Sequence, residues 1–294
     1  MEGFIIGQAT FPAREIEPGL YLVATPIGNL GDMTVRGLEV LASADTIACE
    51  DTRVTGKLLK HFAIATRMTA YHEHNADKAG PKLLEMLREG ARVALVSDAG
   101  TPLVSDPGYR LVEAARAEGL PVWPVPGASA PIAALAASGM PSDTFLFDGF
   151  LPTKTNARRK RLGELRDIPA TLIFFESPNR LAECLADIAA ELGETRRLAV
   201  CRELTKLHEE VRSGGAGELA QAYAGQKVKG EIVLVLAPPA DDETNAIDTD
   251  ALLAELLETA SVSRAAAQAA ELTGRPRREL YQRALELSGG KRKK

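Results

Sequence analysis

Residues 92–102 read RVALVSDAGTP, a short apolar run followed at once by a loop of small and polar residues. Such a run, bounded by turn-forming residues, predicts a buried strand that ends in a ligand-facing loop. Similar runs occur at residues 20–24, 46–49 and 121–125, and helical patterns occur at residues 35–42, 82–88, 109–117 and 130–138. Because strands and helices alternate, we predict βαβ units and a mostly parallel sheet with these loops along one edge.

A second series of the same kind follows residues 140–143. Strands fit residues 144–147, 171–175, 197–201 and 231–237, and a long helix fits residues 179–192. Residues 238–248 combine Pro-Pro with an acidic run, and short helices fit residues 251–257, 263–272 and 277–287. We therefore predict an N-terminal extension (1–19), two α/β domains (20–139 and 140–239), an acidic linker (240–250) and a basic helical module (251–294).

The composition is that of an ordinary globular protein, with 45% hydrophobic and 26% charged residues among 294. The three cysteines, Cys49, Cys184 and Cys201, include no Cys-x-x-Cys pair, which predicts buried thiols and no disulfide or metal site. Glu2 stands where a signal peptide carries a basic residue, and no apolar run is long enough to cross a membrane. We therefore expect a cytoplasmic protein with no metal and no membrane contact.

Charge is unevenly distributed along the chain. The net charge is −5, so any nucleic-acid binding must be confined to part of the surface. Residues 154–166 hold six basic residues and one acid, and residues 275–294 hold eight basic residues and two acids. These segments favour a polyanionic partner, although a solvated surface or, at the C-terminus, dimer packing would also explain them. The predicted RNA-binding residues are Lys154, Arg158, Arg159, Lys160, Arg161, Arg275, Arg277 and Arg278.

Three loops at predicted strand ends are candidates for a ligand site. They begin at Thr25-Pro26, at Asp98-Ala99-Gly100 and at Pro126, and neither a Gly-x-Gly-x-x-Gly nor a Walker sequence is present. Turn geometry and helix capping would explain any one of them. Together they favour a groove for an elongated zwitterionic ligand, because glycine admits close approach and a helix N-terminus suits a carboxylate.

Four motifs give a more specific indication. They are LVATPIGNLGD (22–32), EDTR (50–53), SDAGTP (97–102) with SDPG (105–108), and FFESPNR (174–180); CRELTK (201–206) and GEIVLV (230–235) accompany them. In order and spacing these motifs resemble those of the small-subunit rRNA methyltransferase I family, a branch of the tetrapyrrole methylase superfamily. The resemblance extends from about residue 20 to the C-terminus.

This resemblance implies a two-lobed tetrapyrrole-methylase-like fold, in which two α/β domains hold S-adenosyl-L-methionine in the cleft between them, plus a small C-terminal helical module. It also implies a homodimer that methylates a ribose 2′-hydroxyl of a decoding-centre cytidine in 16S rRNA of the small ribosomal subunit. By position, the cofactor residues would be Thr25, Pro26, Asp98, Ala99, Gly100, Leu103, Ser129, Ala130, Phe175, Glu176, Glu203 and Leu204. The Asp98–Gly100 loop and Ser129-Ala130 would meet the methionine end, and Leu103, Phe175-Glu176 and Glu203-Leu204 would meet the adenosine.

Methyl transfer from a sulfonium to a ribose oxygen needs positioning above all, helped by a base or by a cation beside the forming alkoxide. The candidates that we select as catalytic are Asp51, Arg53 and Lys206, with Glu50, Glu203, His72 and His74 as further possibilities. An acid at the start of a helix is often only a cap, so a structural role for the 50–53 segment stays open.

Two other functions fit parts of the pattern. One is methylation of a small tetrapyrrole-like substrate, which would need neither basic segment. The other is a non-enzymatic ribosome-assembly factor with a retained cofactor fold, which would show no turnover with assembled subunits.

Overall fold

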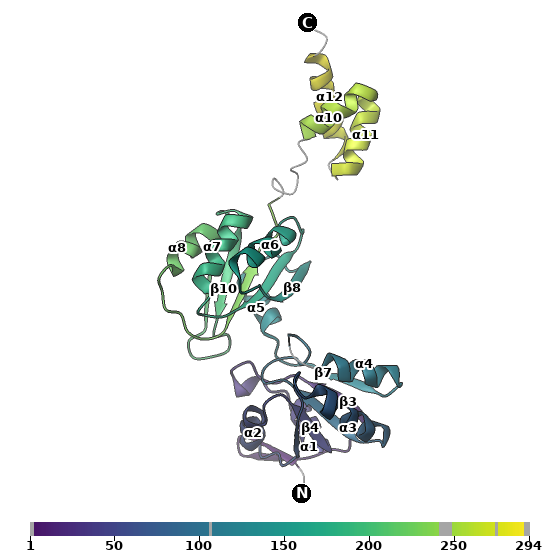
Figure 1. The fold of residues 1–294 in the computed structure, drawn as a ribbon, viewed down its shortest axis with the longest axis vertical. Helices are drawn as coiled ribbons and strands as arrows, with labels where there is room; N and C mark the ends of the chain where they lie inside the picture. The colour runs from purple at the N-terminus through teal and green to yellow at the C-terminus, as the bar shows by residue number, and fades with distance from the viewer. Residues whose placement is uncertain (1–2, 106–107, 241–248, 274–275, 291–294) are drawn as a thin grey trace.

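Two five-stranded sheets, one in each lobe, organise the chain, and a separate group of helices follows them (Figure 1). The computed structural model describes residues 3–105, 108–240, 249–273 and 276–290. The predicted α/β class with two lobes and a helical module is confirmed.

The first lobe contains a fully parallel sheet with strand order β5-β4-β6-β3-β7. Its strands are β3 (Gly19–Val23), β4 (Thr46–Cys49), β5 (Met68–Ala70), β6 (Arg92–Val96) and β7 (Val122–Val125). Strand β4 is buried along its whole length, as its continuous apolar sequence predicts for a strand covered on both faces. The parallel order brings the carboxyl ends of β3, β4 and β6 to one edge of the sheet.

Helices cover both faces of this sheet. Helices α1 (Val35–Ser43) and α2 (Thr52–His61) share one apolar cluster with β4, whereas α3 (Ala76–Arg88) and α4 (Tyr109–Ala117) share another. Each of the first two helices begins at a capping side chain: Thr34 Oγ1 accepts from Gly37 N at 3.0 Å, and Asp51 Oδ1 accepts from Arg53 N at 2.8 Å. A short 3-10 turn (Leu30–Asp32) precedes α1.

The N-terminal extension folds as an antiparallel hairpin of β1 (Gly3–Ile6) and β2 (Ala9–Pro12). Phe4 is buried and its ring stacks on Phe11 with centroids 5.3 Å apart. Ile5 N donates to Phe62 O at 2.9 Å, so the hairpin is attached to the end of α2.

The second lobe has strand order β11-β10-β12-β9-β8, and only the β8–β9 pair is parallel. The strands are β8 (Phe145–Phe150), β9 (Thr171–Glu176), β10 (Arg197–Arg202), β11 (Glu210–Gly215) and β12 (Ile232–Leu236). The expectation of a mostly parallel sheet is therefore wrong for this lobe. A strand buried on both faces has the same apolar sequence in either orientation, so the sequence pattern did not reveal the direction.

Helices α6 (Thr155–Leu165), α7 (Leu181–Leu192) and α8 (Ala216–Tyr223) pack on one face of the second sheet. Helix α5 (Ala130–Ser138) covers the other face, where Ala134 and Leu135 belong to the same cluster as Ile173 and Val233. Although α5 lies within the range expected for the first domain, it thus packs on the second sheet and connects the two lobes.

The C-terminal module consists of α10 (Thr249–Thr259), α11 (Val262–Thr273) and α12 (Arg277–Gly290) around its own small core. Leu253, Ala266 and Leu280 lie in that core. Most of the predicted acidic linker lies outside the described residues. Figure 1 shows the module beyond the second lobe, at the far end from the N-terminus.

Across the residues that the structure describes, no helix is both long and apolar enough to cross a membrane. The three cysteines are buried and free, in agreement with the prediction.

Candidate functional site

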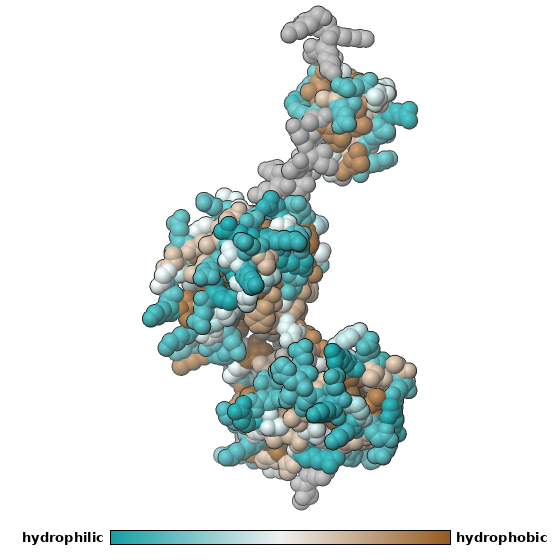
Figure 2. Space-filling view, viewed as in Figure 1, coloured by the Kyte–Doolittle hydropathy of each residue, from teal (hydrophilic) through white to brown (hydrophobic). Residues whose placement is uncertain are grey.

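A cavity of about 390 Å³ lies where the two lobes meet. This volume is within the range of small-molecule sites, roughly 300–1,000 Å³. Among the described residues its walls come from the strand-end loops of the first lobe, the start of α5, and strands and loops of the second lobe. They are Ile27, Ala99, Gly100, Thr101, Val104, Ser105, Ser129, Ala130, Pro131, Phe150, Phe175, Glu176, Ser177, Pro178, Gly230, Glu231, Ile232 and Val233. In Figure 2 hydrophobic residues are visible at the level where the lobes meet.

The loop after β6 forms the first-lobe wall and is held by backbone contacts. Thr25 and Gly100 exchange two hydrogen bonds, with N–O distances of 2.9 and 3.0 Å, and Thr101 Oγ1 donates to Ala128 O at 3.1 Å. Gly100 has a φ of +79°. Two non-glycine residues, Leu103 and Ser105, also have positive φ values, of +73° and +64°. Such strain is typical of ligand-contacting loops, where the surrounding structure fixes an unfavourable backbone.

The start of α5 forms a second part of the wall. Ser129 is the N-cap residue, but its side chain makes no capping hydrogen bond, and Pro131 follows in the first turn. The partial positive charge of this helix end therefore faces the cavity without a side-chain partner from the cap residue. It is suited to a carboxylate or another anionic group.

Aromatic side chains form the second-lobe wall. The Phe175 ring lies 5.0 Å from the Phe147 ring and 5.4 Å from the Phe150 ring, between centroids. Phe150 is 58% exposed, so a large apolar ring is available at the cavity. Such a surface is suited to stacking of a flat heteroaromatic group.

A buried carboxylate follows this wall. Glu176 is 3% exposed, and its two oxygens accept from Ser177 N at 2.7 Å and from Arg180 Nη2 at 3.2 Å. Arg180 also donates to Leu151 O at 2.8 Å, so it joins the end of β9 to the segment after β8. Burial, with the Glu176 charge as a second cause, raises the pKa of the neighbouring Cys184 thiol well above its usual value.

Lys206 lies between two carboxylates at the rim of the cavity. Its Nζ donates to Glu203 Oε1 at 2.7 Å and to Glu231 Oε2 at 2.8 Å, and the bond from Lys206 lowers the pKa of Glu203. The lysine stem also occupies the space that a side chain at Gly28 (φ +153°) would need. The predicted catalytic lysine is thus in place to fix Glu231 and to contact the first lobe.

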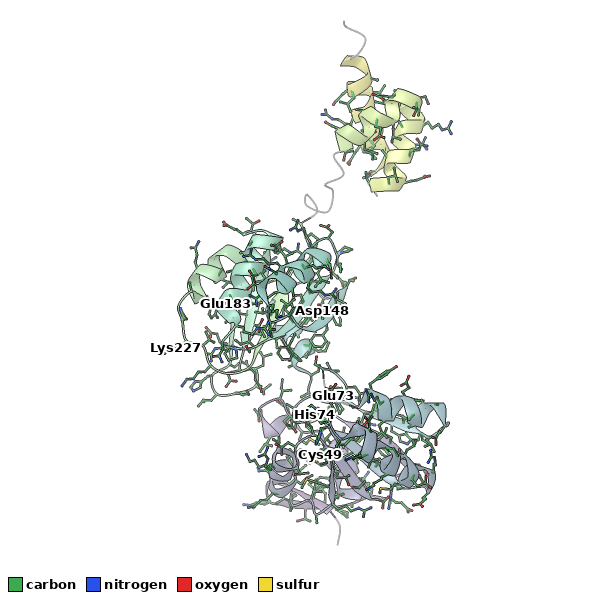
Figure 3. The ribbon with its side chains drawn as sticks, viewed as in Figure 1. Cys49, Glu73, His74, Asp148, Glu183 and Lys227 are labelled. Carbon is green, nitrogen blue, oxygen red and sulfur yellow. The ribbon has the colours of Figure 1, made fainter. Side chains whose placement is uncertain are left out.

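A second, shallower pocket of about 430 Å³ opens beside the loop after β6. It is lined by Glu50, Asp51, Thr52, Arg53, Ala70, His72, His74 and Asp98. These residues follow β4, β5 and β6, whose carboxyl ends lie together in the parallel sheet. Figure 3 shows His74 at the end of the first lobe that faces the second lobe.

The acids in this pocket have different environments. Asp51 caps α2 and accepts from the Arg53 guanidinium, and these hydrogen bonds lower its pKa to about 2. Burial, together with the Asp98 charge, raises the pKa of Glu50. Asp98 Oδ1 accepts from Asp51 N at 3.1 Å, which joins the start of α2 to the loop of the first cavity. Asp51 therefore has the capping role that the sequence left open, and Glu50 is the carboxylate better suited to accept a proton.

The twelve predicted cofactor residues separate into three groups. The cavity is lined by six of them: Ala99, Gly100, Ser129, Ala130, Phe175 and Glu176. Asp98 lines the second pocket instead. The other five, Thr25, Pro26, Leu103, Glu203 and Leu204, are outside the described lining of the cavity. Thr25 and Leu204 are buried in the protein, and Leu103 packs on the apolar cluster beneath α4.

Several lining residues were not predicted from the sequence, including Ile27, Val104, Ser105, Phe150 and the 230–233 segment. Most of these residues lie within or beside the quoted motifs. Extending the motifs by a few residues would therefore have identified them. Asp106 and Pro107 of the SDPG motif lie outside the described residues. Across the described ranges no group of three or more His, Cys, Asp or Glu side chains could hold a metal ion.

The basic segment at residues 154–166 differs from the expectation at one position in particular. Arg158 is fully buried, and its Nε donates to Asp187 Oδ2 at 2.6 Å, so the prediction that it contacts RNA is wrong. Arg159 also binds Asp187, and Arg161 pairs with Asp148 and with Glu164.

Other predicted RNA contacts remain exposed. They are Lys154 before α6, Arg159 and Lys160 within it, and Arg277 and Arg278 at the start of α12. Arg275 lies outside the described residues.

Comparison with known proteins defines the class of protein. A family model for tetrapyrrole (corrin/porphyrin) methylases matches residues 19–220, and one for the RsmI C-terminal HTH domain matches residues 243–288. The solved structure of cobalt precorrin-4 methyltransferase, a cobalamin biosynthetic enzyme, has the same fold with a TM-score of 0.57 at 19% identity. The match covers 74% of this chain and 94% of that chain. Two α/β lobes around a cavity thus define an S-adenosyl-L-methionine-dependent methyltransferase of the tetrapyrrole methylase class.

Relatives in sequence identify the particular family within this class. Ribosomal RNA small subunit methyltransferase I of Mesorhizobium japonicum is 56% identical over 284 residues, which cover 96% of this chain and 97% of the relative. The protein of the same name from Escherichia coli O157:H7 is 48% identical over 274 residues, covering 92% and 96%. The chain belongs to the ribosomal RNA small subunit methyltransferase I family, as its motifs predicted.

Proposed function

We propose that this enzyme transfers a methyl group from S-adenosyl-L-methionine to the ribose 2′-hydroxyl of a decoding-centre cytidine in 16S rRNA. The substrate would be the assembled small ribosomal subunit, and the enzyme would act as a cytoplasmic homodimer. The observation that carries this proposal is the cavity between the lobes, in a chain that matches rRNA methyltransferases over nearly its full length.

The cavity residues fit the chemistry of the cofactor. The uncapped N-terminus of α5 suits its carboxylate, and the Phe150 and Phe175 rings suit its adenine. Glu231, fixed by Lys206, and the backbone near Gly100 supply polar contacts at opposite sides of the cavity. None of these contacts needs a metal ion.

The cofactor supplies an activated methyl group, and the protein must hold the acceptor oxygen in line with it. Correct positioning of two reactants contributes roughly 7–11 kcal/mol to lowering a barrier. The loop after β6 is suited to this task, since Ala99 and Gly100 line the cavity while the preceding Asp98 lines the second pocket.

RNA binding would use local basic surface, because the net charge of the chain is −5. Lys154 and Lys160 are exposed on one lobe, and Arg277 and Arg278 are exposed on α12 of the module that matches the HTH family model. These separate contacts to phosphates would orient a folded subunit, and aromatic residues for base stacking are few there. The shape of the subunit would then locate the target nucleotide.

The test is transfer of labelled methyl groups to intact small subunits, to free 16S rRNA and to a short hairpin, followed by digestion to nucleosides. We expect label in 2′-O-methylcytidine, and the fastest transfer to the intact subunit. Label on a base, or equal rates with all three RNAs, would contradict the proposal. Transfer to a porphyrinoid in place of RNA would support the small-molecule alternative, and no transfer at all would support the assembly-factor alternative.

Two binding measurements complete the test. Calorimetry in the presence of a chelator should show S-adenosyl-L-methionine binding, and its absence would contradict the assignment of the cavity. Light scattering on the purified protein should give the mass of a dimer, and a monomer mass would exclude the homodimer.

A further inference from the structure

The outward face of α2 is basic along its length. Arg53, Lys57 and Lys60 are exposed and recur at intervals of four and three residues, so they lie on one side of the helix. His61 ends the same helix, and no acid occurs between Thr52 and His61. The side chains of the opposite face, including Leu58 and Leu59, are buried against the sheet.

The lysines of this face differ from the arginines of α6. In α6 the arginines Arg158, Arg159 and Arg161 pair with carboxylates. In the described part of the chain no acid forms an ion pair with Lys57 or Lys60 of α2, nor with Lys160 of α6. Arg53 forms an ion pair with Asp51 at the first turn. Paired charges largely cancel their external field, so the exposed lysines of α2, like Lys154 and Lys160, are more available to an anionic partner than the paired arginines of α6.

This basic face begins at the second pocket. Asp51 and Arg53 are lining residues of that pocket and also form the first turn of α2. Asp98 joins the pocket to the loop whose next two residues, Ala99 and Gly100, line the cofactor cavity. The basic face of α2 therefore adjoins the second pocket, and the second pocket adjoins the cofactor cavity.

The pocket is polar and contains an atom without a partner. Ala70 is the only apolar residue in its described lining, and the Nδ1 atom of His72 is buried with no hydrogen-bond partner in the described structure. The carboxylate residues Glu50 and Asp98 line the same pocket. Hydroxyl groups of a sugar are ligands that would satisfy such a mixture of acceptors and an imidazole.

We infer that the acceptor nucleotide of the RNA binds in the pocket of Glu50, His72 and Asp98, and that phosphates flanking it bind the basic face of α2. This inference rests on the proposed rRNA substrate and assigns its place on the enzyme. The occupant is a phosphodiester backbone, because the face is purely cationic and leads to a sugar-sized polar pocket. In this arrangement Glu50 accepts the proton of the 2′-hydroxyl as the oxygen–methyl bond forms and the sulfonium–methyl bond breaks.

The charged groups around Glu50 agree with this role. Burial is the main cause that raises the pKa of Glu50; the charges of Asp98 in the β6 loop and Asp51 at the start of α2 add to it, and His72 in the β5–α3 loop lowers it. Arg53 and His74 complete the ionisable lining. The resulting rise in the pKa of Glu50 makes its carboxylate a stronger proton acceptor than Asp51, which is held by Arg53.

The first experiment measures affinity for small ribosomal subunits at several salt concentrations for the double variant Lys57→Gln/Lys60→Gln. Loss of two phosphate contacts should reduce the slope of log K against log salt by about 1.4. The fall in affinity between 50 and 200 mM salt would then be about sevenfold smaller than in the wild type. Affinity for S-adenosyl-L-methionine should not change.

A matched control is the double variant Lys78→Gln/Lys82→Gln. Both lysines are exposed on α3, which covers the opposite face of the sheet and carries acids as well as bases. This control should retain the wild-type salt slope. If the α2 variant behaves like the control while the wild type methylates ribose, the inference is overturned and the proposed function stands.

The second experiment replaces Glu50 by Gln. Loss of a proton acceptor should lower kcat by about 100-fold or more, with affinities for the subunit and the cofactor unchanged. Wild-type kcat should fall as the pH drops through the raised pKa of Glu50, and this dependence should be absent in the variant. A kcat within twofold of the wild type would exclude Glu50 as the proton acceptor, and failure of the wild type to methylate ribose would instead refute the proposed function.

Discussion

The buried ion pair of α6 allows a stringent test of why Arg158 does not contact RNA. Replacing Arg158 with Met keeps the length of the side chain and removes its charge. Arg158 and Asp187 are 0% and 3% exposed, and Arg158 Nε lies 2.6 Å from the Asp187 carboxylate. The substitution therefore leaves the buried Asp187 carboxylate with one partner fewer. Breaking such a pair costs about 3–5 kcal/mol.

The lower end of this range applies, because Arg159 still donates to the other Asp187 oxygen at 2.7 Å. A loss of about 3 kcal/mol lowers the thermal midpoint of a protein of this size by about 6–12 °C. The neighbouring variant Lys160→Gln is the control, since Lys160 is exposed and should leave the midpoint within a degree or two.

Thermal unfolding and the salt dependence of subunit binding should be measured on the same samples. We expect Arg158→Met to unfold at a lower temperature and to bind RNA, below that temperature, with the wild-type salt slope. The double variant Arg158→Met/Asp187→Leu should recover part of the stability, because it removes the orphaned charge as well. An unchanged midpoint with a reduced salt slope would refute the structural role and restore an RNA contact.

Other predictions concern the cofactor cavity, the thiols and the helical module. Phe175→Ala should weaken S-adenosyl-L-methionine binding by about 1–3 kcal/mol by calorimetry, the range for loss of base stacking, and Phe145→Ala, at the start of β8, should not. Gly100→Val should weaken the same binding more strongly, because a branched residue resists a φ of +79° at the cavity wall; unchanged affinity would remove this loop from the site. Burial raises the pKa of all three cysteine thiols, so a thiol reagent at pH 8 should label them only after unfolding, and rapid labelling of the native protein would contradict their burial. A chain ending at Ala240 should bind the cofactor normally and the ribosomal subunit less tightly; equal affinity for the subunit would exclude the module from RNA binding.

The first lobe was the most predictable part of the fold. Its buried strands are continuous apolar runs, and α4 and α5 have the bounds that their periodicity indicated. Strand β5 was not predicted, because it has only three residues. Helix α6 was not predicted for a different reason. One of its buried positions is Arg158, which a hydrophobic pattern counts as solvent-exposed.

The topology of the second lobe depends on contacts that the pattern does not encode. Strand β11 has the polar sequence EVRSGG and forms an edge, so it lacks the apolar run that marks an internal strand. Insertion of β12 between β9 and β10 makes this sheet mostly antiparallel. Neither the edge strand nor the insertion alters the local apolar sequence of β9, β10 and β12.

The site was predictable where a loop's position along the chain also fixes its position in space. Ala99, Gly100 and Ser129 line the cavity because parallel strands end at one edge of the sheet. Glu203 and Lys206 are different, since their mutual ion pair and the bond to Glu231 were not apparent from sequence distance. Counting charges along the chain also gave the α6 arginines too much weight, because the sequence does not show which basic side chains have acidic partners.

The central claim is methylation of one ribose in 16S rRNA, and mass-spectrometric mapping of that RNA from a strain lacking this gene tests it most directly. In that strain a single 2′-O-methylated cytidine at the decoding centre should lose its ribose methyl group, and it should regain the group when the wild-type gene is restored. An unaltered set of ribose methylations in the deletion strain, or loss of a base methylation alone, would contradict this claim.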